Sequence, residues 1–285
     1  MIIRRSKTYI CFFVLMLATV QMVGQARAEL ATRVLLQDLD SPWAFAFISE
    51  SQALITLKGG EVVLADLNKQ RISPLPGGPE SVVKGQGGLL DIELHPDFSN
   101  NQWLYLTFTH ETDEGYTTAL ARARFQQDRL ADTETIFTAK AFGGGGRHFG
   151  SRLAFDDQGF LYMSIGDRGE REYSQDLTHH HGKIVRLRDD GSIPGHNPFV
   201  DHANALPEIF SYGHRNPQGM VFDHENKRLW IHEHGPRGGD ELNLVQAGKN
   251  YGWPLVSHGR EYYGPRISSE TEMEGVNSPV FKWTP

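Results

Sequence analysis

The chain has 285 residues, of which 39% are hydrophobic and 22% charged, enough for one large globular unit or two small ones. This composition excludes disorder and collagen-like repetition, and the net charge of −7 disfavours nucleic acid as a partner. Glycine makes up about one residue in ten against a usual figure of roughly 7%. Because short alternating runs outnumber helical stripes, the sequence predicts a turn-rich, all-β protein.

Residues 1–28 have the pattern of a secretory signal peptide. They combine a basic start that includes Arg4, an apolar stretch at 10–20 and a small-x-small cleavage pattern at 26–28. The apolar stretch is shorter than the roughly 20 residues that span a bilayer, which disfavours the alternative of a transmembrane anchor. We therefore expect a periplasmic protein with a mature domain at 29–285 and no stable membrane span after cleavage.

Cleavage would remove four basic residues and no acidic one, so the net charge would change from −7 to −11. Cys11, which is the single cysteine, would leave with the signal peptide. The mature domain would then have no thiol, which excludes disulfides, thiolate nucleophiles and cysteine-ligated zinc.

One strand-turn-strand unit recurs four times along the chain. Each copy joins two alternating apolar strands through a polar turn. The copies are 43–48 with 53–57, 89–94 with 103–108, 152–155 with 160–165, and 219–222 with 228–232. Residues 119–125, 183–188 and 241–245 alternate in the same way and predict further strands.

The spacing of the copies favours a β-propeller. The aligned positions Phe47, Leu94, Phe155 and Phe222 are 47, 61 and 67 residues apart, close to the 40 to 50 residues of a four-stranded blade once insertions are allowed. A β-sandwich with accidental similarity is the alternative. Since a propeller has to close its ring, and the sequence stops at Pro285 where another strand pair opens, we expect the closing C-terminal blades to be missing.

Four glycine-rich loops near these strands carry polar side chains, a composition typical of a ligand site. The loops are 85–88, 143–150, 213–219 and 233–241. Residues 143–146 lack the following Lys-Ser/Thr of a phosphate-binding loop, which disfavours a nucleotide site. His148 is a candidate general base because imidazole titrates near neutral pH, and a surface or structural histidine is the alternative.

Further polar residues suggest ligand chemistry. Arg215 and Asn216 place a planar cation beside an amide, which suits carboxylates or quinone oxygens, whereas an arginine that bridges blade loops is the alternative. Residues 235–241 supply carbonyls and carboxylates that suit Ca²⁺.

The histidines offer weaker metal-site candidates. Consecutive histidines 179–181 cannot all face one ion from a strand, so we expect them to be solvated loop residues. His232 and His234 could share a strand face and bind a metal, but the cysteines of a zinc deaminase are missing.

Five ordered segments resemble the soluble glucose/sorbosone dehydrogenase family, most closely the periplasmic aldose sugar dehydrogenases that use pyrroloquinoline quinone (PQQ). The segments are Gly85-Gln-Gly-Gly-Leu-Leu-Asp-Ile, His148-Phe-Gly-Ser-Arg-Leu-Ala-Phe, Ser211-Tyr-Gly-His-Arg-Asn-Pro-Gln-Gly-Met, Glu233-His-Gly-Pro-Arg-Gly-Gly-Asp-Glu-Leu-Asn and Gly248-Lys-Asn-Tyr-Gly-Trp-Pro. The resemblance covers nearly all of 30–285. It implies a six-bladed β-propeller with PQQ at the mouth of the central channel.

The resemblance also implies catalytic and cofactor-binding roles. His148 would be the base that takes the proton of the anomeric hydroxyl while hydride passes to PQQ. Arg215 would stabilise the negative charge that develops on the quinone. Gln86, Asn216 and Tyr262 would contact PQQ, as would His148 and Arg215.

For the metal, the resemblance implies two Ca²⁺ sites. The carbonyls of Gly235 and Pro236 would hold a cofactor-bound Ca²⁺, and Glu241 with the carbonyl of Tyr251 would hold a second ion. Arg147 stands where glucose dehydrogenases of the family carry an acid, which bears on the sugar preference.

The expected function is a PQQ- and Ca²⁺-dependent aldose dehydrogenase. It would oxidise C1 of aldose sugars to lactones and pass electrons to a quinone or another acceptor. One alternative is a Ca²⁺-dependent propeller hydrolase such as a lactonase, which would act without PQQ. Another is a truncated, non-catalytic propeller that only binds a ligand or partner.

Overall fold

The computed structural model describes residues 31–283. The predicted signal peptide at 1–28 lies outside the described residues. In the unit that begins at Leu35, the only helical segments among the described residues are the short helix α1 (Phe98–Asn101) and the 3₁₀ turn η1 (Arg171–Ser174). Within the described part of the chain, no helix is long and apolar enough to cross a membrane.

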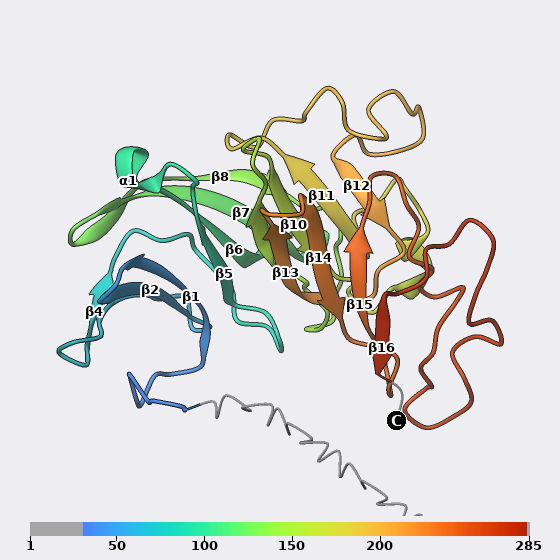
Figure 1. Ribbon diagram of the computed structural model, residues 1–285, viewed down its shortest axis with the longest axis horizontal. Helices are drawn as coiled ribbons and strands as arrows, with labels where there is room; N and C mark the ends of the chain where they lie inside the picture. Colours follow the sequence, from blue (N-terminus) through green and yellow to red (C-terminus); the bar gives the residue numbers. More distant parts are fainter. Residues whose placement is uncertain (1–30, 284–285) are drawn as a thin grey trace, which may run out of the picture. The chain divides into compact units, whose positions relative to one another are not determined.

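In residues 31–283, sixteen strands form four antiparallel sheets that follow one another along the chain (Figure 1). The first sheet contains β1 (Pro42–Ser49), β2 (Gln52–Leu57), β3 (Val62–Asp66) and β4 (Arg71–Leu75). The second contains β5 (Leu89–Leu94), β6 (Trp103–Thr112), β7 (Gly115–Gln126) and β8 (Arg129–Thr138). The third contains β9 (Leu153–Phe155), β10 (Leu161–Ile165), β11 (Lys183–Leu187) and β12 (Ile209–Tyr212). The fourth contains β13 (Pro217–Asp223), β14 (Arg228–Glu233), β15 (Asp240–Val245) and β16 (Phe281–Trp283).

Each sheet is a propeller blade whose first two strands are one copy of the repeat seen in the sequence. The further strands expected at 119–125, 183–188 and 241–245 are β7, β11 and β15. The first strands of neighbouring blades pack together, β1 with β5, β5 with β9, and β9 with β13. This arrangement confirms the all-β propeller and rules out the alternative of two sheets stacked as a sandwich.

The described residues form four blades, one for each repeat copy, whereas the family resemblance implied a ring of six of which this chain would lack the closing blades. Long connections between strands make the third and fourth blades longer in sequence than a minimal four-stranded blade. Residues 188–208 connect β11 to β12, and residues 246–280 connect β15 to β16. With insertions of this size, the 253 residues that the structure describes suffice for four blades of four strands.

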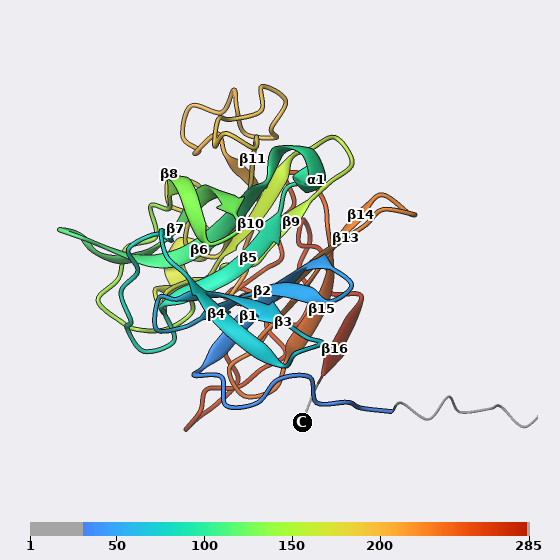
Figure 2. The ribbon, with the colours of Figure 1, turned by 90° about the vertical axis from the view of Figure 1, so that its left-hand side faces the viewer.

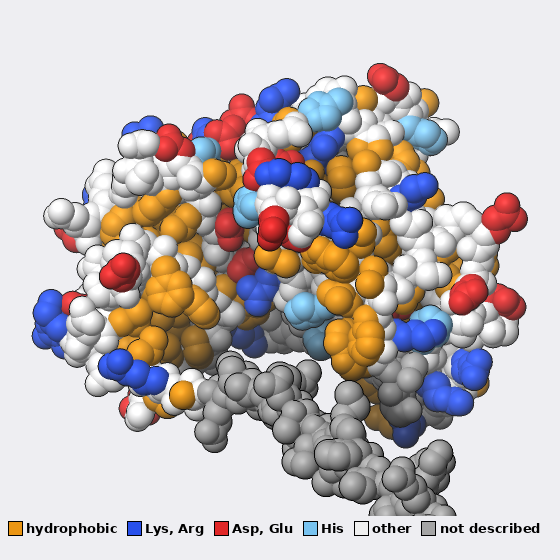
Figure 3. All heavy atoms as spheres, in the orientation of Figure 1, with side chains coloured by type: hydrophobic (Ala, Val, Ile, Leu, Met, Phe, Trp, Pro, Cys, Tyr) orange, Lys and Arg blue, Asp and Glu red, His pale blue; other side chains and the backbone are white. Residues whose placement is uncertain are grey.

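The hydrophobic core lies between adjacent blades. Leu54 and Leu104 pack in the layer between the first and second blades, Leu120 and Leu161 in the next layer, and Phe210 in the third layer with side chains of β14. Hydrophobic side chains also reach the surface (Figure 3). These exposed side chains include Phe45 and Phe47 of β1 and Val221, Phe281 and Trp283 of the fourth blade.

Strand direction determines where the polar loops lie. Because the strands of a blade alternate in direction, the loop before the first strand and the loop after the second strand emerge at the same end. The loops at 84–88, 143–150 and 213–216 precede β5, β9 and β13, and those at 166–170 and 234–239 follow β10 and β14. All five loops therefore emerge at one end of the blades. In Figure 2 the first blade faces the viewer.

Candidate functional site

His148 is held by two side chains in the loop that precedes β9. Its backbone has φ of +54°, and its N–H donates to Oε1 of Gln86 at 2.7 Å. Its ring Nδ1 lies 2.6 Å from Oδ1 of Asp167. A carboxylate at this distance requires the proton on Nδ1, so the neutral ring has Nε2 as its free acceptor. The side chain is 13% exposed and lines two pockets.

Asp167 follows β10 and is almost fully buried. Its Oδ1 also accepts the N–H of Gly169 at 2.8 Å, and its Oδ2 accepts Nε1–H of Trp253 at 2.8 Å. Burial raises the pKa of Asp167, but the hydrogen bond and charge of His148, with Arg215 nearby, outweigh burial and hold it below the usual 3.8. The carboxylate is therefore ionised at neutral pH and holds His148 in one tautomer.

Asp167 was not among the residues predicted from the sequence. A signal was present, because Gly166-Asp-Arg-Gly169 places an acid between glycines at the end of a strand. That pattern is the same one that distinguished the four polar loops. Asp167 and His148 are 19 residues apart and lie in two different loops, so only the fold brings them together.

Arg168 holds the glycine-rich loop that leads to His148. This arginine is 1% exposed, and its guanidinium donates to the carbonyls of Gly145 (2.9 Å) and Arg147. The guanidinium also lies over the ring of Phe149, with 3.4 Å from Cζ to the ring centroid. Burial lowers the pKa of Arg168 to about 10, so it remains a cation at neutral pH.

The loops at 85–88 and 143–146 contact each other through their backbones. The N–H of Gln86 donates to the carbonyl of Gly146 at 2.7 Å. A Cβ on Gly146 would lie 2.9 Å from both Cα of Gly85 and the carbonyl oxygen of Lys84, closer than real Cβ contacts. Glycine is thus required here because the backbones of two loops approach closely, and this approach brings Gln86 to His148.

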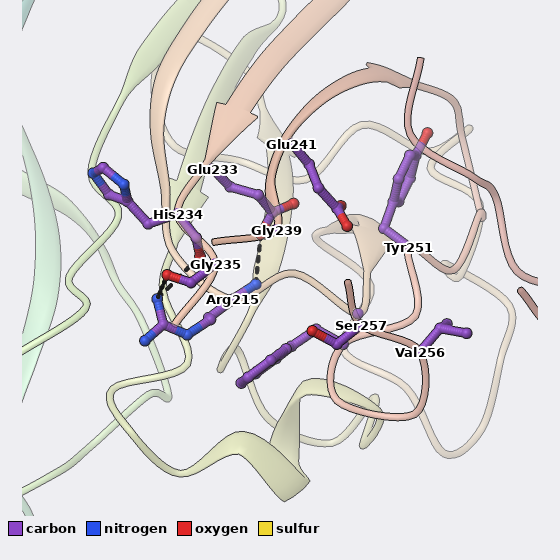
Figure 4. A pocket seen from close by; sticks show the side chains of 11 residues that line it. Arg215, Glu233, His234, Gly235, Gly239, Glu241, Tyr251, Val256 and Ser257 are labelled. Carbon is purple, nitrogen blue, oxygen red and sulfur yellow. Dashed lines mark hydrogen bonds between the residues drawn. The ribbon is translucent and has the colours of Figure 1, made fainter. Parts of the chain in front are cut away.

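The sequence left open whether Arg215 binds a ligand or bridges blade loops, and in the structure it both bridges loops and lines a pocket. Its Nη1 donates to the carbonyls of His234 (3.0 Å) and Gly235 (3.1 Å), so it does bridge loops of the fourth blade (Figure 4). Its backbone N–H donates to Glu233 at 2.6 Å. The same guanidinium lines a pocket beside His148. Asn216 is buried, and its Oδ1 accepts the N–H of Gly150 at 3.1 Å.

Two adjoining pockets bring the predicted cofactor residues together. We call the first the arginine pocket; it is lined by Gln86, Arg147, His148, Asp167, Gly169, Arg171, Arg215, Pro236, Trp253, Glu261, Tyr262 and Ile267. We call the second the amide pocket; it is lined by Gln86, His148, Arg215, Asn216, Gln218, His234, Gly235, Pro236, Gly238, Asp240 and Tyr262. All five residues predicted to contact the cofactor line one or both pockets.

Glu241 and Tyr251 line a third pocket, which we call the carboxylate pocket, together with Glu233 (Figure 4). Burial and the charge of Glu233 raise the pKa of Glu241 to about 8. Nδ2 of Asn243 donates to Glu233 and Glu241, while its buried Oδ1 has no partner among the described residues. A buried and a partly buried carboxylate beside an unpaired amide oxygen are a donor set that suits a hard cation.

The four predicted metal ligands line two neighbouring pockets that share Gly235. Gly235 lines both the amide pocket and the carboxylate pocket, Pro236 lines the amide pocket, and Glu241 and Tyr251 line the carboxylate pocket. The Gly235 carbonyl also accepts a hydrogen bond from Arg215. Within residues 31–283, no group of three or more His, Asp or Glu side chains has metal-binding geometry.

The expectation of three solvated histidines at 179–181 is wrong for two of them. His180 is fully buried, and its Nε2 lies 3.0 Å from Oε1 of Glu208. His181 is 2% exposed and its Nε2 lies 3.1 Å from the carbonyl of Phe142. The segment packs under neighbouring loops, where each ring finds a polar partner. Of the three, His179 alone is partly exposed, and it lies beside Asp176.

Comparison with known proteins identifies the family of this chain. The glucose / sorbosone dehydrogenase family model matches residues 39–285. The chain is 42% identical over 279 residues to aldose sugar dehydrogenase YliI of Escherichia coli K12, covering 95% of this chain and 75% of that protein. It is 29% identical over 259 residues to quinoprotein glucose dehydrogenase B of Acinetobacter calcoaceticus, covering 79% of this chain and 52% of that protein.

Solved structures show the same relationship. A crystal structure of glucose dehydrogenase has a TM-score of 0.85 at 39% identity, over 88% of this chain and 75% of that one. The PQQ-bound form of aldose sugar dehydrogenase from Streptomyces coelicolor has a TM-score of 0.74 at 30% identity, over 88% of this chain and 70% of that one. Fold and site define a β-propeller enzyme of the dehydrogenase class. The chain belongs to the glucose/sorbosone dehydrogenase family, as the sequence motifs indicated.

Proposed function

We propose that this protein is a PQQ- and Ca²⁺-dependent aldose dehydrogenase in which His148 is the general base. The observation that carries the proposal is the His148–Asp167 pair at the wall of a pocket that Arg215 also lines. A buried carboxylate that orients an imidazole is the arrangement a proton-accepting histidine needs. The S. coelicolor relative, whose structure contains PQQ, supports the cofactor.

The donor set fits an anionic quinone such as PQQ. The guanidinium of Arg215 and the side-chain amides of Gln86 and Asn216 all line the amide pocket, with Tyr262 at the same wall. Cations and N–H donors are the groups that bind carboxylates and quinone oxygens. We propose that these four residues hold PQQ, and that the carbonyls of Gly235 and Pro236 hold its Ca²⁺.

The chain's own residues perform the proton chemistry. When bound, PQQ supplies the hydride acceptor. Nε2 of His148 would take the proton of the C1 hydroxyl, and with loss of the C1 hydride to that acceptor the aldose would become a lactone. Asp167 stabilises the imidazolium that forms, and Arg215 adds positive charge to the same wall, which favours negative charge on a bound ligand. The electrons then leave to a quinone or another acceptor.

A reconstitution assay tests the proposal. The full chain is mixed with PQQ and Ca²⁺, and dye reduction is followed with several neutral aldoses. We expect turnover that falls by about a hundredfold or more in His148→Ala, since a general base contributes roughly 10² to 10⁴ in rate. Lactone hydrolysis without PQQ would favour a hydrolase instead. Absence of turnover together with absence of a PQQ-induced rise in melting temperature would favour a non-catalytic propeller.

Calcium is tested separately at the carboxylate pocket. A cation there would offset the repulsion between Glu233 and Glu241, so removal of Ca²⁺ by a chelator should lower the melting temperature. In Glu241→Gln this dependence on Ca²⁺ should be smaller than in the parent chain. Equal melting temperatures with and without Ca²⁺ in the parent chain would contradict a structural Ca²⁺ site.

We also propose that residues 1–28 direct export to the periplasm. Cleavage after Ala28 predicts a mature protein that begins at Glu29. Mass spectrometry of the protein recovered from the periplasmic fraction tests this, and recovery of the uncleaved chain from the cytoplasm would contradict it.

A further inference from the structure

Arg147 places a guanidinium without a partner at the arginine pocket. It directly precedes His148, and its exposed side chain lines the pocket together with His148 and Arg215. Among residues 31–283, no carboxylate, carbonyl or side-chain oxygen is hydrogen-bonded to this guanidinium. The cation is therefore available to a ligand.

Gly169 provides the surface on which this guanidinium rests. A Cβ on Gly169 would lie 2.3 Å from Nε and 2.6 Å from Nη2 of Arg147, so the guanidinium lies directly on the backbone where a side chain would otherwise be. Arg168 fixes the other end, because its guanidinium donates to the carbonyl of Arg147. These two contacts direct an exposed arginine toward the pocket.

The other charged groups of the arginine pocket are already engaged. Arg171 pairs with Glu261 at 2.7 Å, and Asp167 pairs with His148. Arg215 donates to two backbone carbonyls. With His148 neutral, three arginines face two carboxylates, so the pocket has a charge of +1 in a chain whose net charge is −7. A positive pocket in an acidic protein selects an anionic ligand.

We propose that Arg147 recognises a negatively charged group on the substrate, so that the preferred substrates are aldoses that carry a carboxylate or a phosphate. This inference rests on the proposed function, because it assumes that the C1 hydroxyl lies at Nε2 of His148. Arg147 and His148 both line the arginine pocket, so the guanidinium and the base face the same space. An ion pair there would orient the sugar with C1 toward His148.

The first test is a substrate comparison with PQQ-loaded enzyme. Glucuronate, glucose 6-phosphate and glucose are compared for the parent chain, Arg147→Gln and Arg147→Glu. In Arg147→Gln, kcat/KM for the two anionic sugars should fall roughly tenfold to a hundredfold, the loss expected for one charge-assisted hydrogen bond. The value for glucose should change much less. Arg147→Glu should lower the anionic sugars further, and added salt should reduce the anionic preference of the parent chain.

The matched control is Arg129→Gln, which removes an exposed arginine at the start of β8 outside both pockets. It should leave all three substrates unchanged. The ratio of glucuronate to glucose 6-phosphate in the parent chain shows which anion is preferred. An equal loss for charged and neutral sugars in Arg147→Gln would overturn the proposal.

The second test does not need turnover. Calorimetric titration of the cofactor-free chain with glucuronate or glucose 6-phosphate should show binding that Arg147→Gln weakens, while glucose binds equally to both. If no sugar is oxidised but this difference is observed, the proposed function fails and the anion site stands. If Arg147→Gln lowers the affinity for PQQ and leaves sugar selectivity unchanged, the guanidinium serves the cofactor and the proposal is overturned.

Discussion

His148 depends on Asp167 for its chemical state. The Nδ1 proton is shared with a carboxylate that also accepts hydrogen bonds from Gly169 and Trp253. Such a carboxylate can neither rotate nor take up a proton readily, because both oxygens are engaged. The histidine therefore presents Nε2 as an acceptor in a fixed direction, which a loop histidine would not otherwise do.

At this scale, we predict that Asp167→Asn lowers kcat by about a hundredfold or more with a small change in KM, because an amide holds the wrong tautomer of His148. Asp132→Asn, an exposed residue with φ of +53°, is the matched control. Steady-state kinetics with a neutral aldose measures the effect. A rise in KM at constant kcat would contradict a role in orienting the base.

The same substitution should change stability with pH. Since the folded-state pKa of Asp167 is lowered, its stabilisation is complete above the ordinary value of 3.8 and is lost as pH falls through the folded value. The difference in melting temperature between the parent chain and Asp167→Asn should therefore be largest near neutral pH and shrink below about pH 4. A difference that grows on acidification would contradict the assigned shift.

At the scale of elements, two glycine loops from the start of neighbouring blades form the base of the site. Gly146 contacts Gly85 and Lys84 through backbone atoms, and this contact sets the distance from Gln86 to His148. The glycine at position 146 is therefore explained by the close packing of two loop backbones. The lack of a phosphate-binding motif in 143–146 agrees with this packing role.

We predict that Gly146→Ala destabilises the protein by about 1 to 3 kcal/mol, because the added methyl meets backbone that has to move. It should also weaken PQQ binding, since Gln86 and His148 would separate. Gly144→Ala is the control, because nothing lies within 4 Å of its added Cβ. Denaturant unfolding and PQQ titration measure the two effects, and similar behaviour of the two variants would contradict the close-approach argument.

At the scale of the whole molecule, Arg152 links all four blades. Its Nη1 donates to Asp91 of β5 at 2.8 Å and its Nε to the carbonyl of Gln218 of β13 at 2.8 Å, while it lies 4.2 Å from the ring centroid of Trp43 of β1. Arg152 itself directly precedes β9. Its side chain therefore contacts the first strands of three blades, and its backbone leads into the first strand of the remaining blade.

We predict that Arg152→Met costs about 2 to 3 kcal/mol of unfolding free energy. The substitution leaves Asp91, which is 5% exposed, without its cation. The cost lies at or just below the roughly 3 to 5 kcal/mol of a fully buried pair because the Arg152 side chain is 29% exposed. Lys69→Met removes the exposed Lys69–Asp66 pair and should cost less than about 1 kcal/mol. Equal costs in denaturant unfolding would contradict the linking role of Arg152.

The sequence by itself determined the blades and the family. Period-two alternation is local, so the strand pairs such as β5 with β6 follow from neighbouring residues, and the ordered motifs placed Gln86, His148 and Arg215 in one pocket. The four repeat copies also predicted the four blades of the described residues, whereas the long connections at 188–208 and 246–280 use chain length without leaving a periodic signal.

Only the tertiary structure decided which side chains meet. The Asp167 carboxylate at His148, the buried contacts of His180 and the unpaired guanidinium of Arg147 all depend on loops from separate parts of the chain. Residue type and spacing do not encode these meetings, because desolvation and partner distance arise when blades pack. The physical reason is that alternation acts between neighbours, whereas charge pairing and burial act across the folded molecule.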